Sequence, residues 1–283
     1  MKMKKLAIFT RVSKAYAPPR LKEEAEKYGI EAKIINYSEV DLKITTSKSE
    51  EFFPHFDFVI FRSSGKEFLP QKMILLSLFE KRGVKILNSE SYKKWWQLDK
   101  LTQQFVFQEN CLPFVETMIF GTKKSLEKNI KDFPKVVKSY SGSHGENVFK
   151  VENRKDLKKI VKKYPPETLL VQPFLPAGED IRVIVLGGKA IGAMKRIARP
   201  SQFLTNYSAG GMVEKFELDK TTRQLAKKAA EAFFLDYVGV DLMKDWQGQW
   251  RILEVNRACQ FEGFEKSTGI NVAKKVVNFL IKK

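Results

Sequence analysis

The chain has 283 residues and a formal net charge of +18, which comes from 51 lysine and arginine and 33 aspartate and glutamate side chains. Its hydrophobic content of 43% and charged content of 30% are typical of a folded globular protein, and no apolar run reaches the length of a membrane helix. The positive charge favours anionic partners such as nucleotides, acidic peptides or nucleic acid. The lysines are spread along the chain, so charge alone does not choose among these partners.

The first residues and the cysteines indicate a cytoplasmic protein with no membrane partner. The basic segment 1–5 is followed only by the apolar residues 6–9, which is too short for the core of a signal peptide. Cys111 and Cys259 lie far apart in the sequence and do not have the spacing of metal ligands. We therefore expect reduced thiols rather than a disulfide.

The first third of the sequence alternates between strand and helix patterns. Strands or short apolar runs are expected over residues 5–9, 31–36, 56–61 and 84–87, and helices over 20–28 and 69–82. This alternation predicts a parallel α/β module that ends near Asn88. Arg62 follows the carboxyl end of a strand, where open α/β sheets bind ligands.

The remaining patterns continue without an internal repeat or a low-complexity stretch. Residues 91–110 are expected to be mostly helical, 114–120 and 135–138 strand-like, 169–172 a short apolar run and 181–186 a strand. Residues 221–234 are predicted to form an amphipathic helix, because their apolar positions fall on one stripe.

Two strand-like segments near the end of the chain carry acidic residues. Segments 238–243 and 251–256 flank a turn at 245–248, so a hairpin would place Asp241 opposite Glu254, with Asn256 on the same face as Glu254. Opposed carboxylates repel each other unless a cation lies between them, and these oxygen ligands suit Mg²⁺. The alternative is a solvated, exposed face. The long mixed segment 257–270 that follows favours a functional site.

A loop rich in glycine and serine follows the strand that ends at Lys138. Glycines let backbone N–H groups approach phosphate oxygens, and hydroxyl groups add donors. The loop does not match a Walker A sequence and is a weak signal alone. Its central residues are Ser141, Gly142, Ser143, His144 and Gly145.

The order of these motifs along the chain is more specific than any one of them. A lysine ends a strand, a glycine-rich loop follows, and then come segments 171–175, 180–182, Asp241 and 254–256. Further matches are 98–101, 193–196, Asn206 ahead of Gly210-Gly211, and 262–270. This order resembles the ATP-grasp superfamily and, more narrowly, the RimK-like carboxylate–amine ligases, over essentially the whole chain.

The resemblance implies an α/β protein with the ATP-grasp fold. Residues 1–88 would form an N-terminal parallel α/β domain, the pre-ATP-grasp domain. Residues 89–175 would form a central ATP-grasp subdomain with the glycine-rich loop, and 176–283 a C-terminal subdomain with the metal site. The two α+β subdomains would clamp ATP between them.

The resemblance also implies roles for individual residues. Arg182, Arg196 and Arg257 would be catalytic, Arg62 would face the substrate, and Asp241, Glu254 and Asn256 would hold Mg²⁺ or Mn²⁺. ATP would be contacted by Lys100, Lys138, Ser141, Gly142, Ser143, His144, Gly145, Gln172, Pro173, Phe174, Leu175, Asp180, Lys195, Thr205 and Asn206. In the implied reaction a carboxylate takes the γ-phosphoryl group of ATP to form an acylphosphate, and an amine then displaces phosphate to form an amide. The acid would be a small molecule or a peptide, and the amine an amino acid or another amine.

The sequence departs from the family at three places, namely Pro173, where an acidic residue is common, Ala209, where an arginine is usual, and residues 257–260. We expect Arg257 to hold a substrate carboxylate in place of the arginine missing at 209, against the alternative of a surface arginine paired with an acid. Two other functions stay open. One is a non-catalytic binder of ATP or nucleic acid, which the metal set argues against. The other is an ATP-grasp ligase that makes a dipeptide or a glutathione-like product. Homo-oligomerisation also stays open.

Overall fold

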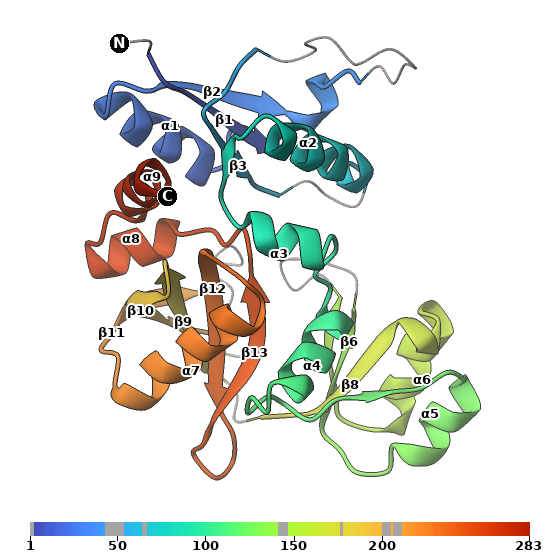
Figure 1. The fold of residues 1–283 in the computed structure, drawn as a ribbon. Coiled ribbons are helices and arrows are strands. Elements are labelled where there is room, and N and C mark those ends of the chain that lie inside the picture. The colour runs from blue at the N-terminus through green and yellow to red at the C-terminus, as the bar shows by residue number, and fades with distance from the viewer. Residues whose placement is uncertain are drawn as a thin grey trace.

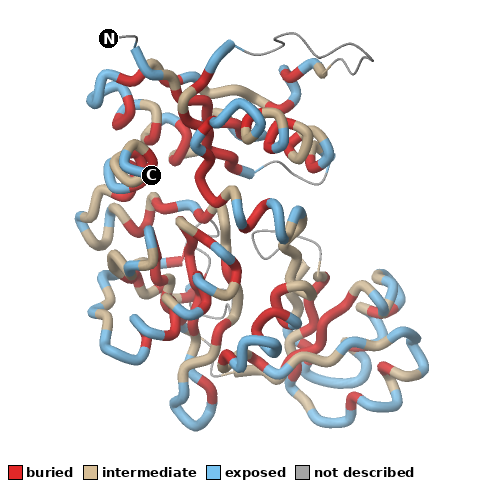
Figure 2. Tube along the Cα trace, in the orientation of Figure 1, coloured by how far each residue is buried: buried red, intermediate tan, exposed pale blue. Residues whose placement is uncertain are grey.

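The computed structural model describes residues 3–42, 54–63, 67–140, 147–175, 178–199, 205 and 211–283. Within these residues three β-sheets organise the fold (Figure 1). The strand orders are β2-β1-β3-β4, β5-β8-β6-β7 and β11-β10-β9-β12-β13. Buried backbone follows the central strands of the sheets, while the outer helices and turns alternate between buried and exposed (Figure 2).

The first sheet is parallel, as the alternation predicted. It contains β1 (Lys5–Thr10), β2 (Glu31–Asn36), β3 (Phe58–Phe61) and β4 (Lys85–Ile86), connected by α1 (Ala17–Lys27), the 3₁₀ turn η1 (Tyr37–Glu39) and α2 (Leu69–Lys81). All but the first residue of β1 is buried, as expected of a parallel strand covered on both faces. Helix α1 begins three residues before the predicted start, because its first turn accepts proline, which needs no N–H partner there.

The predicted helix over 91–110 is in fact two helices, α3 (Ser89–Lys94) and α4 (Lys100–Glu109). Asp99 explains the new start, because its side chain accepts a hydrogen bond of 2.8 Å from the Thr102 N–H and so caps α4. The strand expected over 114–120 is shorter than predicted, and only β5 (Met118–Ile119) pairs with its sheet. Phe114 instead bridges to Ile252 in the third sheet.

The second sheet is antiparallel. Its strands are β5, β6 (Lys135–Ser139), β7 (Val148–Val151) and β8 (Leu169–Pro173), and it is accompanied by α5 (Lys123–Asn129), α6 (Arg154–Lys163) and the 3₁₀ turn η2 (Pro166–Thr168). Leu126 of α5 and Leu157 of α6 pack with Val137 and Val171 of the sheet in one buried cluster.

The third sheet is antiparallel and holds the longest strands. They are β9 (Glu179–Leu186), β10 (Lys189–Ile197), β11 (Met212–Phe216), β12 (Tyr237–Lys244) and β13 (Trp250–Asn256), with α7 (Lys220–Ala232), α8 (Glu262–Thr268) and α9 (Val272–Lys282). Val183 and Val240 point to one face and pack under α7, while Ile184 and Met194 point to the other face and pack in the cluster that contains α8 and α9.

Helix packing connects the third sheet and its helices to the rest of the chain. Helix α9 lies beside α1 of the first module (Figure 1). Helix α4 contacts α7 and β13, although it precedes the second sheet in sequence. Among the described residues, no helix is both long and apolar enough to span a membrane.

Candidate active site

Four charged side chains gather at one end of the third sheet. Asp241 on β12 lies opposite Arg182 on β9, and Asp180, two residues earlier on β9, lies opposite Arg196 on β10. Because strand side chains alternate between faces, these residues share the face that does not carry α7. The apolar residues of this face pack under α8 and α9. The four charged residues form the polar end of the same face.

Paired hydrogen bonds hold the four side chains together. Arg182 donates Nε–H and Nη2–H to the two carboxylate oxygens of Asp241, both at 2.7 Å. Arg196 donates to both oxygens of Asp180 at 2.6 and 2.7 Å, and its Nη2 also lies 3.0 Å from Asp241 Oδ2. The Thr205 hydroxyl donates to Asp180 at 2.6 Å. This two-point geometry fixes the plane of each guanidinium group.

The electrostatics of the cluster keep its members charged. Burial raises the pKa of the Asp241 carboxyl, but Arg182 and Arg196 more than offset this, so its pKa lies below the usual value. Burial alone would lower the pKa of Arg196, and the carboxylates of Asp241 and Asp180 raise it above the ordinary value. The cluster therefore presents fixed positive groups beside acidic ones at neutral pH.

The predicted metal residues lie at the edge of this cluster. The register confirms that Asp241 lies opposite Glu254, and Asn256 lies opposite Gly239. The register shifts between Asp241 and Leu242, which leaves Leu253 as an extra residue on β13. Among the described residues, no group of three or more His, Cys, Asp or Glu side chains could hold a metal. A metal here would therefore depend on Asn256 and on ligand oxygens in addition to the two carboxylates.

A lysine on the second sheet and one on α4 lie near the same place. Lys138 on β6 is buried, and burial lowers its pKa to about 8, although the Glu254 carboxylate opposes this shift and Lys100 adds to it. Lys138 therefore lies within electrostatic range of both Lys100 and Glu254. The site therefore lies between the second and third sheets, as a nucleotide clamp requires.

The segment Gln172 to Leu175, whose residues are predicted to contact ATP, begins in β8 of the second sheet and leads towards β9 of the third, and we refer to it as the hinge. Gln172 is buried, and its amide N–H donates to the Thr117 hydroxyl at 2.7 Å. The Phe174 carbonyl accepts a bond of 2.9 Å from the indole N–H of Trp246, at the tip of the β12–β13 hairpin. Sequence reasoning missed Thr117 and Trp246, because each is far in sequence from the hinge residue that it contacts.

Two predicted residues lie apart from the cluster. Lys195 is adjacent to Arg196 on β10 and so faces the other way, where it pairs with Glu214 at 2.5 Å and Glu179 at 3.4 Å. Arg257 directs its guanidinium group to the carbonyls of Ser91, Trp95 and Trp96 at the end of α3. No ion pair of Arg257 occurs in the described part of the chain, so it is neither an arginine paired with an acid nor aimed at the cluster.

The first module contributes Arg62, which is buried beyond the end of β3. Its Nη2 donates to the Cys259 carbonyl at 2.9 Å. The Cys259 side chain lies over Gly239, where a Cβ atom would come within 2.9 Å of Sγ and 3.3 Å of Arg182 Cδ. Arg62 therefore approaches the charged cluster from the first module. Both cysteines are free, with Cys111 exposed and Cys259 buried.

Several predicted residues lie outside the described part of the chain. They are Ser141, Gly142, Ser143, His144, Gly145 and Asn206, together with the departure at Ala209. Their predicted contacts with ATP stay predictions.

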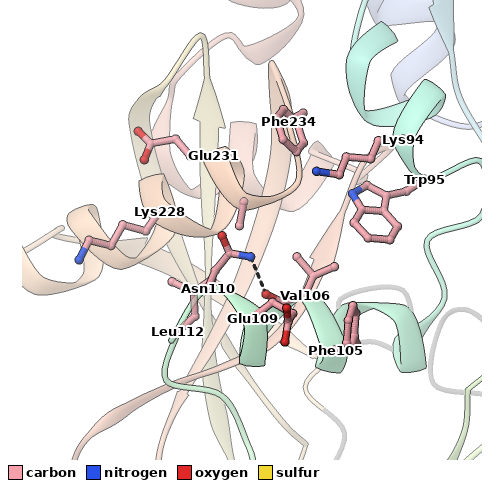
Figure 3. Close-up of a pocket in the computed structure, with 11 residues that line it drawn as sticks. Lys94, Trp95, Phe105, Val106, Glu109, Asn110, Leu112, Lys228, Glu231 and Phe234 are labelled. Carbon is pink, nitrogen blue, oxygen red and sulfur yellow. Dashed lines mark hydrogen bonds between the residues drawn. The ribbon is translucent and has the colours of Figure 1, made fainter.

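A cavity of about 540 Å³ lies elsewhere, between α3, α4 and the end of α7 (Figure 3). Its lining includes Trp95, Phe105, Asn110 and Phe234 and none of the predicted site residues. Because α7 covers the opposite face of the third sheet, this cavity is separated from the charged cluster by the sheet itself. We therefore take the charged cluster, rather than this cavity, as the candidate active site.

Comparisons with known proteins identify the family and the fold of the chain. The profile of the RimK-like ATP-grasp domain matches residues 98–280, and that of the RimK PreATP-grasp domain matches residues 3–91. A probable alpha-L-glutamate ligase of Histophilus somni (strain 2336) is 31% identical over 297 residues, covering 96% of this chain and 97% of the relative. A protein of the same name from Psychromonas ingrahamii is 32% identical, covering 98% and 95%. The ATP-grasp ligase PsnB, solved with a phosphomimetic variant of its minimal precursor, Mg and ADP, superposes with a TM-score of 0.77 at 16% identity, covering 100% and 99%.

Proposed function

We propose a specific reaction for this chain, which belongs to the RimK-like ATP-grasp family and is an ATP-dependent carboxylate–amine ligase. The acid is activated as an acylphosphate, and the amine is an acidic amino acid, glutamate in the first instance. Two relatives that match nearly the whole chain are named alpha-L-glutamate ligases, which supports this choice of amine. The net charge of +18 favours acidic substrates in the same way.

In the first step, an oxygen of the substrate carboxylate attacks the γ-phosphorus of ATP. The bond between that phosphorus and the β,γ-bridging oxygen breaks, and ADP leaves with the electron pair. Charge spreads over the transferring phosphoryl oxygens, so the protein acts by positioning and by fixed positive charge. Arg182 and Arg196 supply that charge, and their paired bonds to Asp241 and Asp180 hold them in place before the substrate arrives.

In the second step, the amine attacks the acyl carbon and phosphate leaves with the oxygen that joined it to the acyl group. The amine loses a proton as the amide forms. Lys138 and Lys100 would neutralise nucleotide phosphates, and this role is supported by the electrostatic interactions of Lys138 with Glu254 and with Lys100. No covalent intermediate with the protein is needed.

The residues at the cluster fit a magnesium ion. Asp241 and Glu254 are opposed in register, and Asn256 adds an amide oxygen on the same face, which are the oxygen ligands that Mg²⁺ prefers. Asp241 already accepts three hydrogen bonds from the arginines, which leaves about one of roughly four lone-pair sites for the ion. When bound, the ion would neutralise phosphate charge.

Three further assignments belong to the same proposal. The predicted division at residues 88 and 175 is supported by the three sheets, each of which falls within one of the three parts. A cytoplasmic location is supported by the two free cysteines. Lys195 and Arg257 are proposed to act indirectly, Arg257 by holding the end of α3 in place.

The single observation that carries the proposal is the pairing of Arg182 and Arg196 with Asp241, opposite Glu254. A screen of purified protein with Mg-ATP and a matrix of acids and amino acids tests it, read by phosphate release and product mass. We expect ADP, phosphate and an amide of the added mass in one well or more, and a loss of all three in Arg196→Lys. Arg251→Lys is the matched control, because Arg251 pairs with Asp245 at 2.7 Å in the hairpin turn, outside the cluster. ADP release without amide would point to an enzyme that hydrolyses ATP, and no ADP release in any well would favour a non-catalytic ATP binder.

A further inference from the structure

Three cations surround one tyrosine between the first module and the third sheet. The Lys72 ammonium on α2 lies 4.8 Å from the centroid of the Tyr92 ring, and the Arg257 guanidinium lies 4.4 Å from the same centroid. The Tyr92 hydroxyl donates to the Phe61 carbonyl at 3.1 Å, next to Arg62. Lys72, Arg62 and Tyr92 are 6%, 4% and 2% exposed.

These cations lack an acidic partner. Among the described residues, no aspartate or glutamate forms an ion pair with any of the three, and Lys72 makes no hydrogen bond there. The Arg62 Nε–H is buried without an acceptor. The Arg257 donors bind carbonyls of α3, whereas the Arg62 Nε–H and the Lys72 ammonium have no acceptor within the described part of the chain. A buried cation without a partner is strongly unfavourable, so such a group is expected only where a ligand completes it.

The position of this group points to a substrate rather than to the nucleotide. Arg62 follows β3 and Lys72 lies in the first turns of α2, so both sit at the carboxyl edge of the parallel sheet, where such sheets bind ligands. Arg62 donates to the carbonyl of Cys259, whose side chain shares the space above Gly239 with Arg182. Arg62 and Lys72 therefore lie next to the charged cluster, with Cys259 between Arg62 and Arg182.

We propose that Lys72 and Arg62 bind one carboxylate of the amino-acid substrate, which itself takes no part in forming the amide bond. This inference rests on the proposed ligase reaction and identifies residues that recognise its amino-acid substrate. It also gives Lys72 and Arg62 the carboxylate-holding role that the sequence suggested for Arg257, whose donors are used by α3.

The charge of Lys72 makes the binding depend on pH. Burial lowers the pKa of Lys72 to about 7, and the positive charge of Arg257 adds to this. The Tyr92 ring also faces it, and burial raises the pKa of the Tyr92 hydroxyl. A bound carboxylate favours the ammonium form. The affinity of the protein for the carboxylate is thus highest near pH 6 and falls by about tenfold towards pH 8. At the higher pH, Lys72 takes up a proton when the carboxylate binds.

Calorimetric titration of L-glutamate into the protein saturated with Mg-ADP tests the proposal directly. In Lys72→Met, glutamate affinity at pH 6 should fall by roughly tenfold to a hundredfold, because a charge-assisted hydrogen bond is lost, while Mg-ADP affinity stays the same. Lys72→Arg should retain binding and lose the tenfold dependence between pH 6 and pH 8. L-glutamine and L-glutamate α-amide, each lacking one carboxylate, identify which carboxylate is held.

Lys81→Met, on the exposed face of the same helix, is the matched control. Equal glutamate affinity in the parent and in Lys72→Met, or no glutamate binding by the parent, would overturn the inference. Failure of the ligase reaction is a separate result, because it appears as the absence of amide in the product screen while the titration reads binding alone.

Discussion

Replacing Lys72 by methionine should make the ligand-free protein more stable, although it removes a charged side chain from a folded contact. Lys72 is 6% exposed, and burial lowers its pKa from 10.5 to about 7. Each pKa unit corresponds to about 1.4 kcal/mol, so the shift from 10.5 to about 7 disfavours the charged form by roughly 5 kcal/mol. The Tyr92 ring, 4.8 Å away, offsets about 1 to 2 kcal/mol of this. Methionine keeps a similar apolar stem without the charge.

The gain has a defined pH dependence. The unfolded chain keeps the lysine protonated up to about pH 10.5, while the folded protein releases this proton near pH 7, so the unfolded state binds more protons between these values. Stability of the parent therefore rises with pH across this window, by up to about 1.4 kcal/mol per unit, relative to the variant. Lys72→Met should be more stable by roughly 2 to 4 kcal/mol at pH 6, and by progressively less towards pH 9.

Urea denaturation of the parent, Lys72→Met and Lys81→Met at pH 6, 7.5 and 9 measures this difference. The exposed Lys81→Met should stay within about 0.5 kcal/mol of the parent at each pH. A Lys72→Met variant that is less stable than the parent at pH 6 would refute the reasoning, because Lys72 would then contribute to folding rather than await a ligand. A constant difference at all three pH values would equally contradict the titration of Lys72.

Three other variants probe the active site. Glu254→Ala should abolish ADP formation while the circular dichroism spectrum is unchanged, and full activity at saturating ATP and limiting Mg²⁺ would remove Glu254 from the metal set. Arg196→Lys loses the two-point bond to Asp180 and should lower kcat by about 10²- to 10³-fold, with Arg251→Lys unaffected; equal kcat values would contradict a role in phosphoryl transfer. Thr117→Val leaves the buried amide of Gln172 without its acceptor, which should destabilise the protein by about 1 to 3 kcal/mol and raise the KM for ATP. An unchanged KM for ATP would mean that Gln172 does not shape the hinge.

The core of the site was predictable because it follows from strand geometry. A hairpin turn at residues 245–248 pairs the two strands, so Asp241 and Glu254 could be expected near each other from the sequence. Their direct opposition also needs the bulge at Leu253, because the pairing next to the turn would by itself place Asp241 opposite Leu253. The parallel first module was predictable for a similar reason, since strands and helices alternate along it. The separation of Lys195 from Arg196 was also readable, because adjacent strand residues face opposite sides.

Other features depend on contacts between distant parts of the chain. The guanidinium group of Arg257 caps the end of α3, some 160 residues earlier, and no local pattern predicts that choice of acceptors. Lys72 reads in sequence as an ordinary surface lysine of a helix, and only the packing of α2 against α3 buries it. Trp246 looks like an exposed turn residue, yet its N–H bonds to the hinge. Such contacts are set by tertiary packing rather than by propensity.

The most direct test of the central claim follows the oxygen atoms of the acid substrate. Once the product screen has identified the acid, its carboxylate is labelled with ¹⁸O, and the enzyme is run with Mg-ATP and glutamate. In the proposed reaction a carboxylate oxygen becomes the bridge of the acylphosphate and leaves with phosphorus. Mass spectrometry should therefore find one ¹⁸O atom in each phosphate released and one in the amide carbonyl. Unlabelled phosphate, or release of AMP and pyrophosphate in place of ADP and phosphate, would contradict the acylphosphate mechanism.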